Sequence, residues 1–127
     1  MIWTFAGAVS GFLAVALGAF GAHALRGRVA PDLFAVFETA VRWHLAHALA
    51  LVALGLGAAR LSPGAVRGIG ALFVVGTVVF AGSLYALALS GVRAWGMVTP
   101  VGGLAFLAGW AWLAWAALLA RGTEARG

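Results

Sequence analysis

The sequence predicts an all-α integral membrane protein, folded as a bundle of four spanning helices with an amphipathic interfacial segment before the second. Hydrophobic residues make up 65% of the 127 residues and charged residues only 9%, whereas soluble domains are about half apolar and about a quarter charged. The charges also lie mainly in short connectors between long uncharged runs, so most of the chain suits a lipid environment. We expect one transmembrane domain, residues 1–127, with almost nothing outside the membrane.

The net charge of +5 comes from arginine, which accounts for all eight basic residues. These arginines are scattered over every connector, a distribution typical of helix anchors that contact lipid headgroups. Nucleic-acid binding needs cations clustered along one surface, so we expect the lipid bilayer, and not a nucleic acid, as a partner. The chain has no cysteine, which excludes disulfides and thiolate metal sites.

The first predicted helix covers residues 2–25 and is long enough to cross a hydrocarbon core of about 30 Å. No arginine precedes it and it is longer than a signal-peptide core, so we interpret it as a retained transmembrane helix. Its small residues recur at alternating steps of four and three, as in the contact seam of a helix pair. They are Gly7, Gly11, Ala14, Gly18 and Gly21. This pattern predicts a face on which a neighbouring helix packs closely.

The second predicted helix covers residues 32–59, and Pro31 suits its first turn. Up to Trp43, apolar residues alternate with charged ones, which is typical of a segment at the membrane interface that then turns or continues into the bilayer. Glu38 and Arg42 are four residues apart on this segment, so we expect them to form an interfacial ion pair.

The third predicted helix covers residues 68–90 and follows a turn at residues 61–64. Gly76, Ser83 and Ser90 recur every seven residues, which places a weakly polar stripe on one side. Hydroxyls on a helix can bond to carbonyls of their own helix. We therefore interpret the stripe as a packing surface.

The fourth predicted helix covers residues 99–120, with Thr99 as its N-cap and Pro100 in its first turn. Three tryptophans point in different directions around it, which favours bulk and lipid contact over a cofactor site. They are Trp110, Trp112 and Trp115.

The arginines are balanced between the two sides of the membrane. One side carries Arg26, Arg28, Arg42 and Arg93, and the other carries Arg60, Arg67, Arg121 and Arg126. Arg42 lies within a helix, and discounting it tips the positive-inside rule towards amino and carboxyl termini that are both cytoplasmic.

Five ionisable residues lie at or near membrane depth, where each is costly unless it has a partner or a function. They are His23, Glu38, Arg42, His44 and His47. At about 100° per residue, His44 and His47 lie on a face of the second helix that does not include Glu38.

These residues allow three interpretations. In the structural one, Glu38 pairs with Arg42. His47 then hydrogen-bonds to the first helix or to His23. In the second, His23, His44 and His47 form a metal site, although no carboxylate lies on that face. In the third, the histidines handle protons or ions. A channel, however, needs a polar lining through the bilayer, and the middles of the second and fourth helices show almost none.

Hydrolytic chemistry is disfavoured by the sequence. It has no Gly-x-Ser-x-Gly motif, no acid near Ser83 and only three acids in all. We therefore expect a non-enzymatic protein with no catalytic residue, no metal and no cofactor. Two histidines on facing helices, such as His23 and His47, would allow haem ligation, and this alternative stays open.

Five short runs of residues occur in a specific order along the chain. They are Gly18-Ala-Phe-Gly-Ala-His23, His47-Ala-Leu-Ala, Gly82-Ser-Leu-Tyr85, Thr99-Pro-Val-Gly-Gly103 and Gly109-Trp110. In this order they closely resemble the YgdD-like family of small bacterial inner-membrane proteins, domain of unknown function 423. The resemblance covers nearly the whole chain. It implies a four-helix protein of the bacterial cytoplasmic membrane and supplies no reaction.

The resemblance also sorts the polar residues. His23 and His47 lie in matching runs, whereas His44 occupies a position where the family accepts other polar residues. The resemblance therefore favours a His23–His47 contact over a metal site at His44. Because the helices alternate in direction, His23 shares one membrane face with residues from the end of the third helix and the start of the fourth. We predict a polar cluster there, made of His23, His47, Ser83, Tyr85 and Thr99.

We expect a protein that works by protein or lipid contact, as an accessory subunit, an assembly factor or a scaffold. Its glycine-rich faces predict a homo-oligomer or a subunit of a membrane complex. Two alternatives come from other classes of protein. One is a small transporter or channel with proton- or ion-handling histidines, and the other is a metal- or haem-binding membrane subunit.

Overall fold

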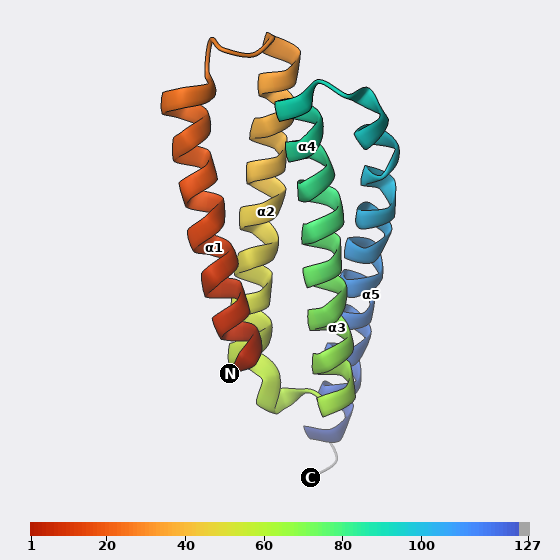
Figure 1. Ribbon diagram of the computed structural model, residues 1–127. Helices are drawn as coiled ribbons and strands as arrows, with labels where there is room; N and C mark the ends of the chain where they lie inside the picture. The colour runs from red at the N-terminus through yellow and green to blue at the C-terminus, as the bar shows by residue number, and fades with distance from the viewer. Residues whose placement is uncertain (125–127) are drawn as a thin grey trace.

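The computed structural model describes residues 1–124, with the side chains of residues 1–120. Over this range the chain forms four long helical rods that lie side by side and run alternately up and down (Figure 1). All four are long and apolar enough to cross a membrane. The predicted all-α bundle of four spanning helices is therefore confirmed.

The first two rods follow the predicted boundaries closely. The first is α1, Ile2–Phe20, which continues as a π-helical turn, Gly21–Leu25. The second is α2, Pro31–Gly57, which ends in a 3₁₀ turn, Ala58–Arg60. Because α2 is unbroken at Trp43, the predicted amphipathic segment is the beginning of the spanning helix and continues directly into it.

The third rod starts earlier than predicted. It consists of α3, Pro63–Gly76, a π-helical segment, Thr77–Ala81, and α4, Gly82–Ser90. It begins at Pro63 and not at Gly68, because the Ser62 side chain caps it by accepting a hydrogen bond of 3.3 Å from the backbone N–H of Ala65. A proline in the first turn has no N–H to leave unsatisfied. A serine–proline pair that also suits a turn is here a helix start.

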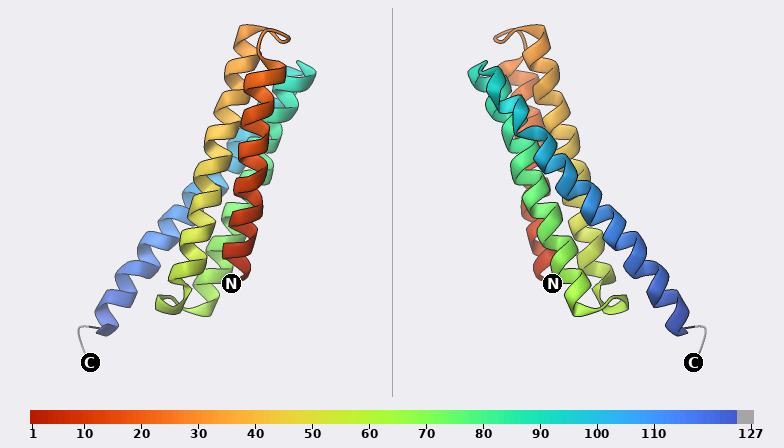
Figure 2. Two further views of the ribbon diagram at one scale, coloured as in Figure 1. Left: turned by 90° about the vertical axis from the view of Figure 1, so that its left-hand side faces the viewer. Right: turned by 90° about the vertical axis from the view of Figure 1, so that its right-hand side faces the viewer.

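The fourth rod is α5, Thr99–Glu124, which follows a 3₁₀ turn, Arg93–Met97. It crosses the bundle obliquely, and its C-terminal half leans away from the other rods (Figure 2). No residue in the range 110–120 is buried. The orientation predicted from the sequence also counts Arg121 and Arg126. The side chains of these two residues lie outside the described residues.

Different helix ends and connectors lie at the two ends of the bundle. The start of α1, the connector at residues 61–62 and the last turns of α5 lie at one end, which we call the terminal end (Figure 1). The connectors at residues 26–30 and 91–98 lie at the opposite, distal end. There the Arg93 guanidinium is 3.1 Å from the Asp32 carboxylate, in an exposed ion pair that ties the connector before α5 to the start of α2.

Two hydrophobic clusters hold the rods together. The larger joins α2, α3 and α5, and its buried members are Ala50, Leu51, Leu54, Ala65, Val66, Ile69, Phe73 and Phe106. The smaller lies towards the distal end, and its members are Leu25, Phe37 and Ala88. The outer faces of the rods carry many exposed apolar side chains, as expected where lipid is the solvent.

The small-residue face of α1 packs against α2. A Cβ atom added at Gly7 would lie 2.7 Å from the carbonyl oxygen of Ala48, and one added at Gly21 would lie 2.8 Å from the ring of Phe37. The other two glycines of the face, Gly11 and Gly18, also point at α2. This face is therefore used within the chain, so an oligomer has to form through another surface.

We predict that Gly7→Ala destabilises the fold, because the backbones of α1 and α2 leave no room for a methyl group. Gly82→Ala is the matched control, since Gly82 is also helical and an added Cβ would meet no heavy atom within 4 Å. Alanine is favoured over glycine in a helix by about 1 kcal/mol, so the control should be as stable as the wild type or more so. Thermal unfolding in detergent, followed by circular dichroism, measures both. A wild-type Tm for Gly7→Ala would contradict the close packing.

Candidate functional site

His47 lies near the middle of α2 and is 2% exposed. Its Nδ1 is 2.9 Å from the carbonyl oxygen of Trp43, and its Nε2 is 3.1 Å from the indole nitrogen of Trp110 on α5. A carbonyl only accepts hydrogen bonds and an indole N–H only donates. The imidazole is therefore held in the neutral tautomer that carries its proton on Nδ1, with both nitrogens satisfied.

Aromatic rings surround His47. Its imidazole stacks on Phe106 of α5, with ring centroids 3.4 Å apart and ring planes 9° apart. Trp43 stacks against it from α2 at 5.7 Å, and Phe73 of α3 meets it edge-on at 5.6 Å. Together with Trp110, these residues form what we call the aromatic cluster. It fills the space between α2, α3 and α5 in the middle of the bundle.

His44 lies about one turn nearer the distal end and faces α1 and α4. Its Nε2 is 3.0 Å from the hydroxyl of Ser10, and its Nδ1 is 3.2 Å from the hydroxyl of Tyr85. A hydroxyl can donate or accept, so either neutral tautomer of His44 satisfies both bonds. His44 thus links three rods without a fixed proton position, in contrast to His47.

A third polar contact joins α4 to the start of α5. Ser83 Oγ is 2.9 Å from the carbonyl oxygen of Phe80 and 2.7 Å from Thr99 Oγ1. Thr99 Oγ1 is also 3.5 Å from the carbonyl oxygen of Trp95, so either hydroxyl can be the donor in the bond between Ser83 and Thr99. The contact fixes where α5 leaves its connector.

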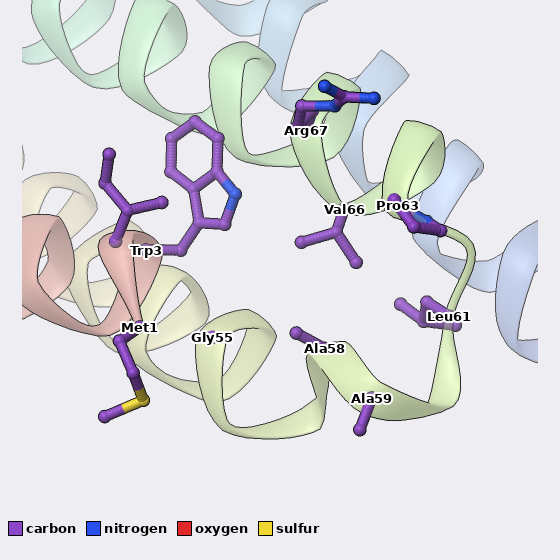
Figure 3. A pocket seen from close by; sticks show the side chains of 10 residues that line it. Met1, Trp3, Gly55, Ala58, Ala59, Leu61, Pro63, Val66 and Arg67 are labelled. Atoms are coloured by element: carbon purple, nitrogen blue, oxygen red, sulfur yellow. The ribbon is translucent and has the colours of Figure 1, made fainter.

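The described residues border cavities of about 510, 370 and 170 Å³, and neither His44 nor His47 lines these three. The largest, about 510 Å³, lies at the terminal end between α1 and the start of α3. Trp3, Val66 and Ala58 are among the apolar residues around it, and Arg67 lies at its edge (Figure 3). A second, about 370 Å³, separates the α2–α3 connector from α5. The third, about 170 Å³, lies between α1 and α2.

The Ser10–His44 pair has the spacing of a nucleophile and its general base. Catalysis also needs space for a substrate and donors for a developing negative charge. None of the three cavities reaches this pair, and Ser10 lies inside a helix whose N–H groups are already bonded. The arrangement suits the linking of helices.

Comparison with known proteins assigns the chain to a family. A family model described as "Protein of unknown function (DUF423)" matches residues 17–103. The chain belongs to this family. It is 43% identical over 105 residues to the UPF0382 membrane protein YwdK of Bacillus subtilis (strain 168), a match that covers 82% of this chain and 85% of YwdK. It is 44% identical over 104 residues to the UPF0382 inner membrane protein YgdD of Escherichia coli (strain K12), covering 82% and 79%. No solved structure matches.

The family resemblance and the membrane setting predicted from the sequence are thus confirmed. The stretch that matches the family model contains His44, His47 and Tyr85 but not Ser10 or Trp110. Both buried histidines therefore belong to the DUF423 segment, and one partner of each lies outside it.

The predicted contact between His23 and His47 is not formed. His23 is exposed on the π-helical turn that ends α1, and both ring nitrogens of His47 are bonded to other groups. The causes are level and helical phase. Gly11 packs at Ala48, next to His47, so His23 lies twelve residues, or about 18 Å, further along the first rod. His23 also follows Gly21 by two residues, which turns it to the opposite side of the helix from Gly21, and Gly21 faces α2.

The other members of the predicted polar cluster form separate pairs. Tyr85 pairs with His44, and Ser83 pairs with Thr99. His47 is bonded to neither pair, because its partners are the carbonyl of Trp43 and the indole of α5.

The alternative metal site at His23, His44 and His47 is not assembled. Among the residues that the structure describes, no group of three His, Cys, Asp or Glu side chains could hold a metal ion. A haem ligated by His23 and His47 fits poorly for the same reasons, since His23 faces outward and Trp110 occupies the Nε2 of His47.

The predicted ion pair between Glu38 and Arg42 is also replaced by other contacts. The Arg42 guanidinium donates to Thr39 Oγ1 at 3.1 Å. Within the described side chains, the ion pair is the one between Asp32 and Arg93. Thr39 precedes Arg42 by three residues, so it lies on the same side of the helix and competes with Glu38 for the guanidinium.

Two residues of the site were missed from the sequence. Ser10 follows Gly7 by three residues, so it belongs to the small-residue face of α1 and a polar partner on α2 could have been sought for it. Trp110 was assigned to bulk and lipid contact. Its bond to His47 depends on how α5 crosses α2, which no local pattern encodes.

We predict that Trp110→Phe lowers stability, because His47 Nε2 loses its donor where no water can replace it. Hydrogen bonds between membrane helices contribute about 0.6 kcal/mol on average and at most about 1.7 kcal/mol, and an unsatisfied acceptor adds to the loss. We therefore expect a decrease of about 1–2 kcal/mol in the free energy of unfolding, measured by titrating micelles with SDS. Trp115→Phe is the control, because Trp115 is also an exposed tryptophan of α5 but its indole makes no hydrogen bond within the described side chains. Equal effects of the two changes would contradict the role given to this bond.

Proposed function

We propose that this chain is a non-enzymatic protein of the bacterial inner membrane that acts by contact. Its contact surface is the C-terminal half of α5, and the group that it contacts is a membrane helix of another chain. Such a protein serves as an accessory subunit, an assembly factor or a scaffold.

The observation that supports this proposal most is the exposure of α5. In the most apolar stretch of the second rod 44% of the residues are buried, whereas in that of the fourth rod only 11% are. No buried residue occurs in the range 110–120, which is the half that leans away from the bundle (Figure 2). A helix of a bundle normally buries one face along its whole length. This half of α5 therefore has an apolar face left for another helix.

The space beside this half of α5 also suits a partner. The cavity of about 370 Å³ has Trp112, Trp115 and Leu119 on one side and Arg60 and Leu61 on the other. Exposed tryptophans beside a groove are frequent anchors of protein–protein contacts. A helix that filled this wedge would bury Trp115, which is 61% exposed.

The partner is a second copy of this chain or another subunit of a membrane complex. The glycine face of α1 packs inside the chain, so it does not serve this contact. A membrane partner packs by shape and not by hydrophobic attraction, because lipid is as apolar as the helix faces. The wedge beside α5 offers such a shape.

The other classes of function have less support. The aromatic cluster occupies the middle of the bundle, where a transporter needs a polar path. The Ser10–His44 pair has no substrate space, which favours a non-enzymatic role. His44, His47 and Ser83 each hold helices together through hydrogen bonds.

We predict that a benzophenone attached to Leu118→Cys forms a protein adduct when native membranes are irradiated. The chain has no cysteine of its own, so the label goes to one position. Phe12→Cys is the control, since Phe12 lies on the outer face of α1 with 73% exposure against 62% for Leu118. Mass spectrometry of the adduct distinguishes a second copy from another subunit.

The proposal expects adducts from position 118 and none from position 12. If lipid adducts alone form at both positions, no protein helix contacts α5 and the proposed function is wrong. If both positions give the same protein adducts, the contact is not specific to α5.

We also propose that both termini face the cytoplasm. Arg42 is discounted because it lies eleven residues inside α2, whereas Arg67 lies only four inside α3. The sequence then assigns four arginines to the side of the termini and three to the other side, and the positive-inside rule puts the richer side in the cytoplasm.

For this orientation we predict that Ala30→Cys at the distal end reacts with a membrane-impermeant maleimide on intact spheroplasts. Gly64→Cys at the terminal end should react only after the membrane is opened. Both positions are exposed, so access decides the labelling. The reverse pattern would invert the orientation.

A further inference from the structure

A groove lies between α1 and α2 towards the distal end of the bundle, with a volume of about 170 Å³. It is lined by Gly18, Gly21, Ala22, Phe34, Phe37, Glu38, Val41 and Arg42. At Gly18 and Gly21, α1 packs closely on Val41 and Phe37 of α2, and the groove runs beside this contact. The ring of Phe37, which is 1% exposed, forms its apolar wall. All the lining residues lie in the stretch that matches the DUF423 family model.

Two opposite charges share this groove without pairing. The Arg42 guanidinium donates to Thr39 Oγ1, and the ion pair among the described side chains lies elsewhere. Glu38 has no hydrogen bond or ion pair within the part of the chain that the structure describes. A carboxylate near membrane depth is costly without a partner. The groove therefore presents one positive and one negative group that a ligand can satisfy together.

The position of these charges along α2 matches the lipid headgroups. The second rod spans Pro31–Arg60, which at 1.5 Å per residue is about 45 Å long. A hydrocarbon core of about 30 Å, centred on the rod, leaves about 7 Å at each end. Glu38 is then about 10 Å from the start of the rod, at the boundary between headgroups and acyl chains. The longer side chain of Arg42 reaches back towards the same level, as its bond to Thr39 shows.

We propose that this groove binds one phospholipid with a phosphoethanolamine headgroup. The phosphate accepts hydrogen bonds from Arg42, and the ammonium group donates to Glu38. The side chains of residues four apart on a helix begin about 5–6 Å apart, which suits a phosphate and an ammonium joined by two carbons. One acyl chain lies along the outside of the contact between Gly18 and Val41.

The same charges select the headgroup. A choline headgroup carries the same charge but has no N–H to donate to Glu38. A glycerol headgroup has no cation, so its phosphate gains Arg42 but leaves the carboxylate unpaired. The groove should therefore prefer phosphatidylethanolamine to phosphatidylcholine and to phosphatidylglycerol. The site is independent of the proposed contact on α5, because it lies towards the distal end and that contact lies towards the terminal end.

Native mass spectrometry tests this proposal. The full chain is released from nanodiscs that contain equal amounts of phosphatidylethanolamine, phosphatidylcholine and phosphatidylglycerol, all with dioleoyl chains, and the bound lipids are counted. The wild type should retain one phosphatidylethanolamine in preference to both other lipids. Glu38→Gln should reduce that preference over phosphatidylcholine about tenfold, the effect of losing one charge-assisted hydrogen bond. Arg42→Gln should reduce the retention of all three lipids.

Asp32→Asn is the control, because Asp32 is an exposed acid of α2 outside the groove. It should bind the three lipids as the wild type does. Ala22→Leu, which narrows the groove from an exposed position of the lining, should reduce the retention of all three lipids, and circular dichroism shows whether this variant is folded. Equal retention of the three lipids by the wild type would overturn the proposal. So would a preference that survives Glu38→Gln, or an effect of Asp32→Asn as large as that of Glu38→Gln.

Discussion

The two buried histidines must satisfy both ring nitrogens where no water is present, and this requirement governs how the rods pack. His47 does so with a carbonyl of its own helix and the indole of Trp110, which draws α5 onto α2. His44 does so with hydroxyls on two other rods, Ser10 of α1 and Tyr85 of α4. Each of the other three rods thus has a hydrogen bond to α2. The second rod is the centre of the bundle, and it is the rod with the largest buried share.

The third rod adapts to these bonds through its π-helical segment, Thr77–Ala81. A π-helical turn changes the phase of the residues that follow and disturbs the pairing of nearby carbonyls. Two hydroxyls bond to carbonyls there, with Thr77 Oγ1 donating to Phe73 and Ser83 Oγ donating to Phe80.

The predicted stripe of Gly76, Ser83 and Ser90 shows how far a regular pattern holds. Gly76 is buried against the ring of Phe106, and Ser83 is buried in its bond to Thr99. Ser90 is exposed and bonds to a carbonyl of its own helix. Ser83 and Ser90 both lie on the regular helix α4, where a seven-residue step changes the phase by only about 20°. Ser90 is exposed because it is the last residue of α4, where the rod ends at the distal connector.

The four spans could be predicted from the sequence because hydropathy and connector charges depend on composition alone. The packing of α1 on α2 could also be predicted, since the glycine seam is a local repeat. The partners of the histidines were harder to predict. His23 could have been set aside by its phase relative to Gly21, whereas the bond between His47 and Trp110 depends on the crossing of α5 over α2. A crossing angle follows from the fit of many side chains, so no single pattern gives it.

The position of α5 follows from where its contacts end. It is held near its start by the bond between Thr99 and Ser83 and in its first half by Phe106, and its last buried residue is Gly109, which packs on Phe73. Beyond that point a helix in lipid loses little by leaving the bundle, because its backbone is already satisfied and lipid replaces the protein around its side chains. Trp112 still packs on Gly68 of α3, and Leu113 and Ala116 still touch the core with one side. The angle set by the first half therefore leaves most of the second half exposed. The same contacts that complete the core thus create the wedge at the terminal end, and its shape is a consequence of the His47 site and not a separate feature of the chain.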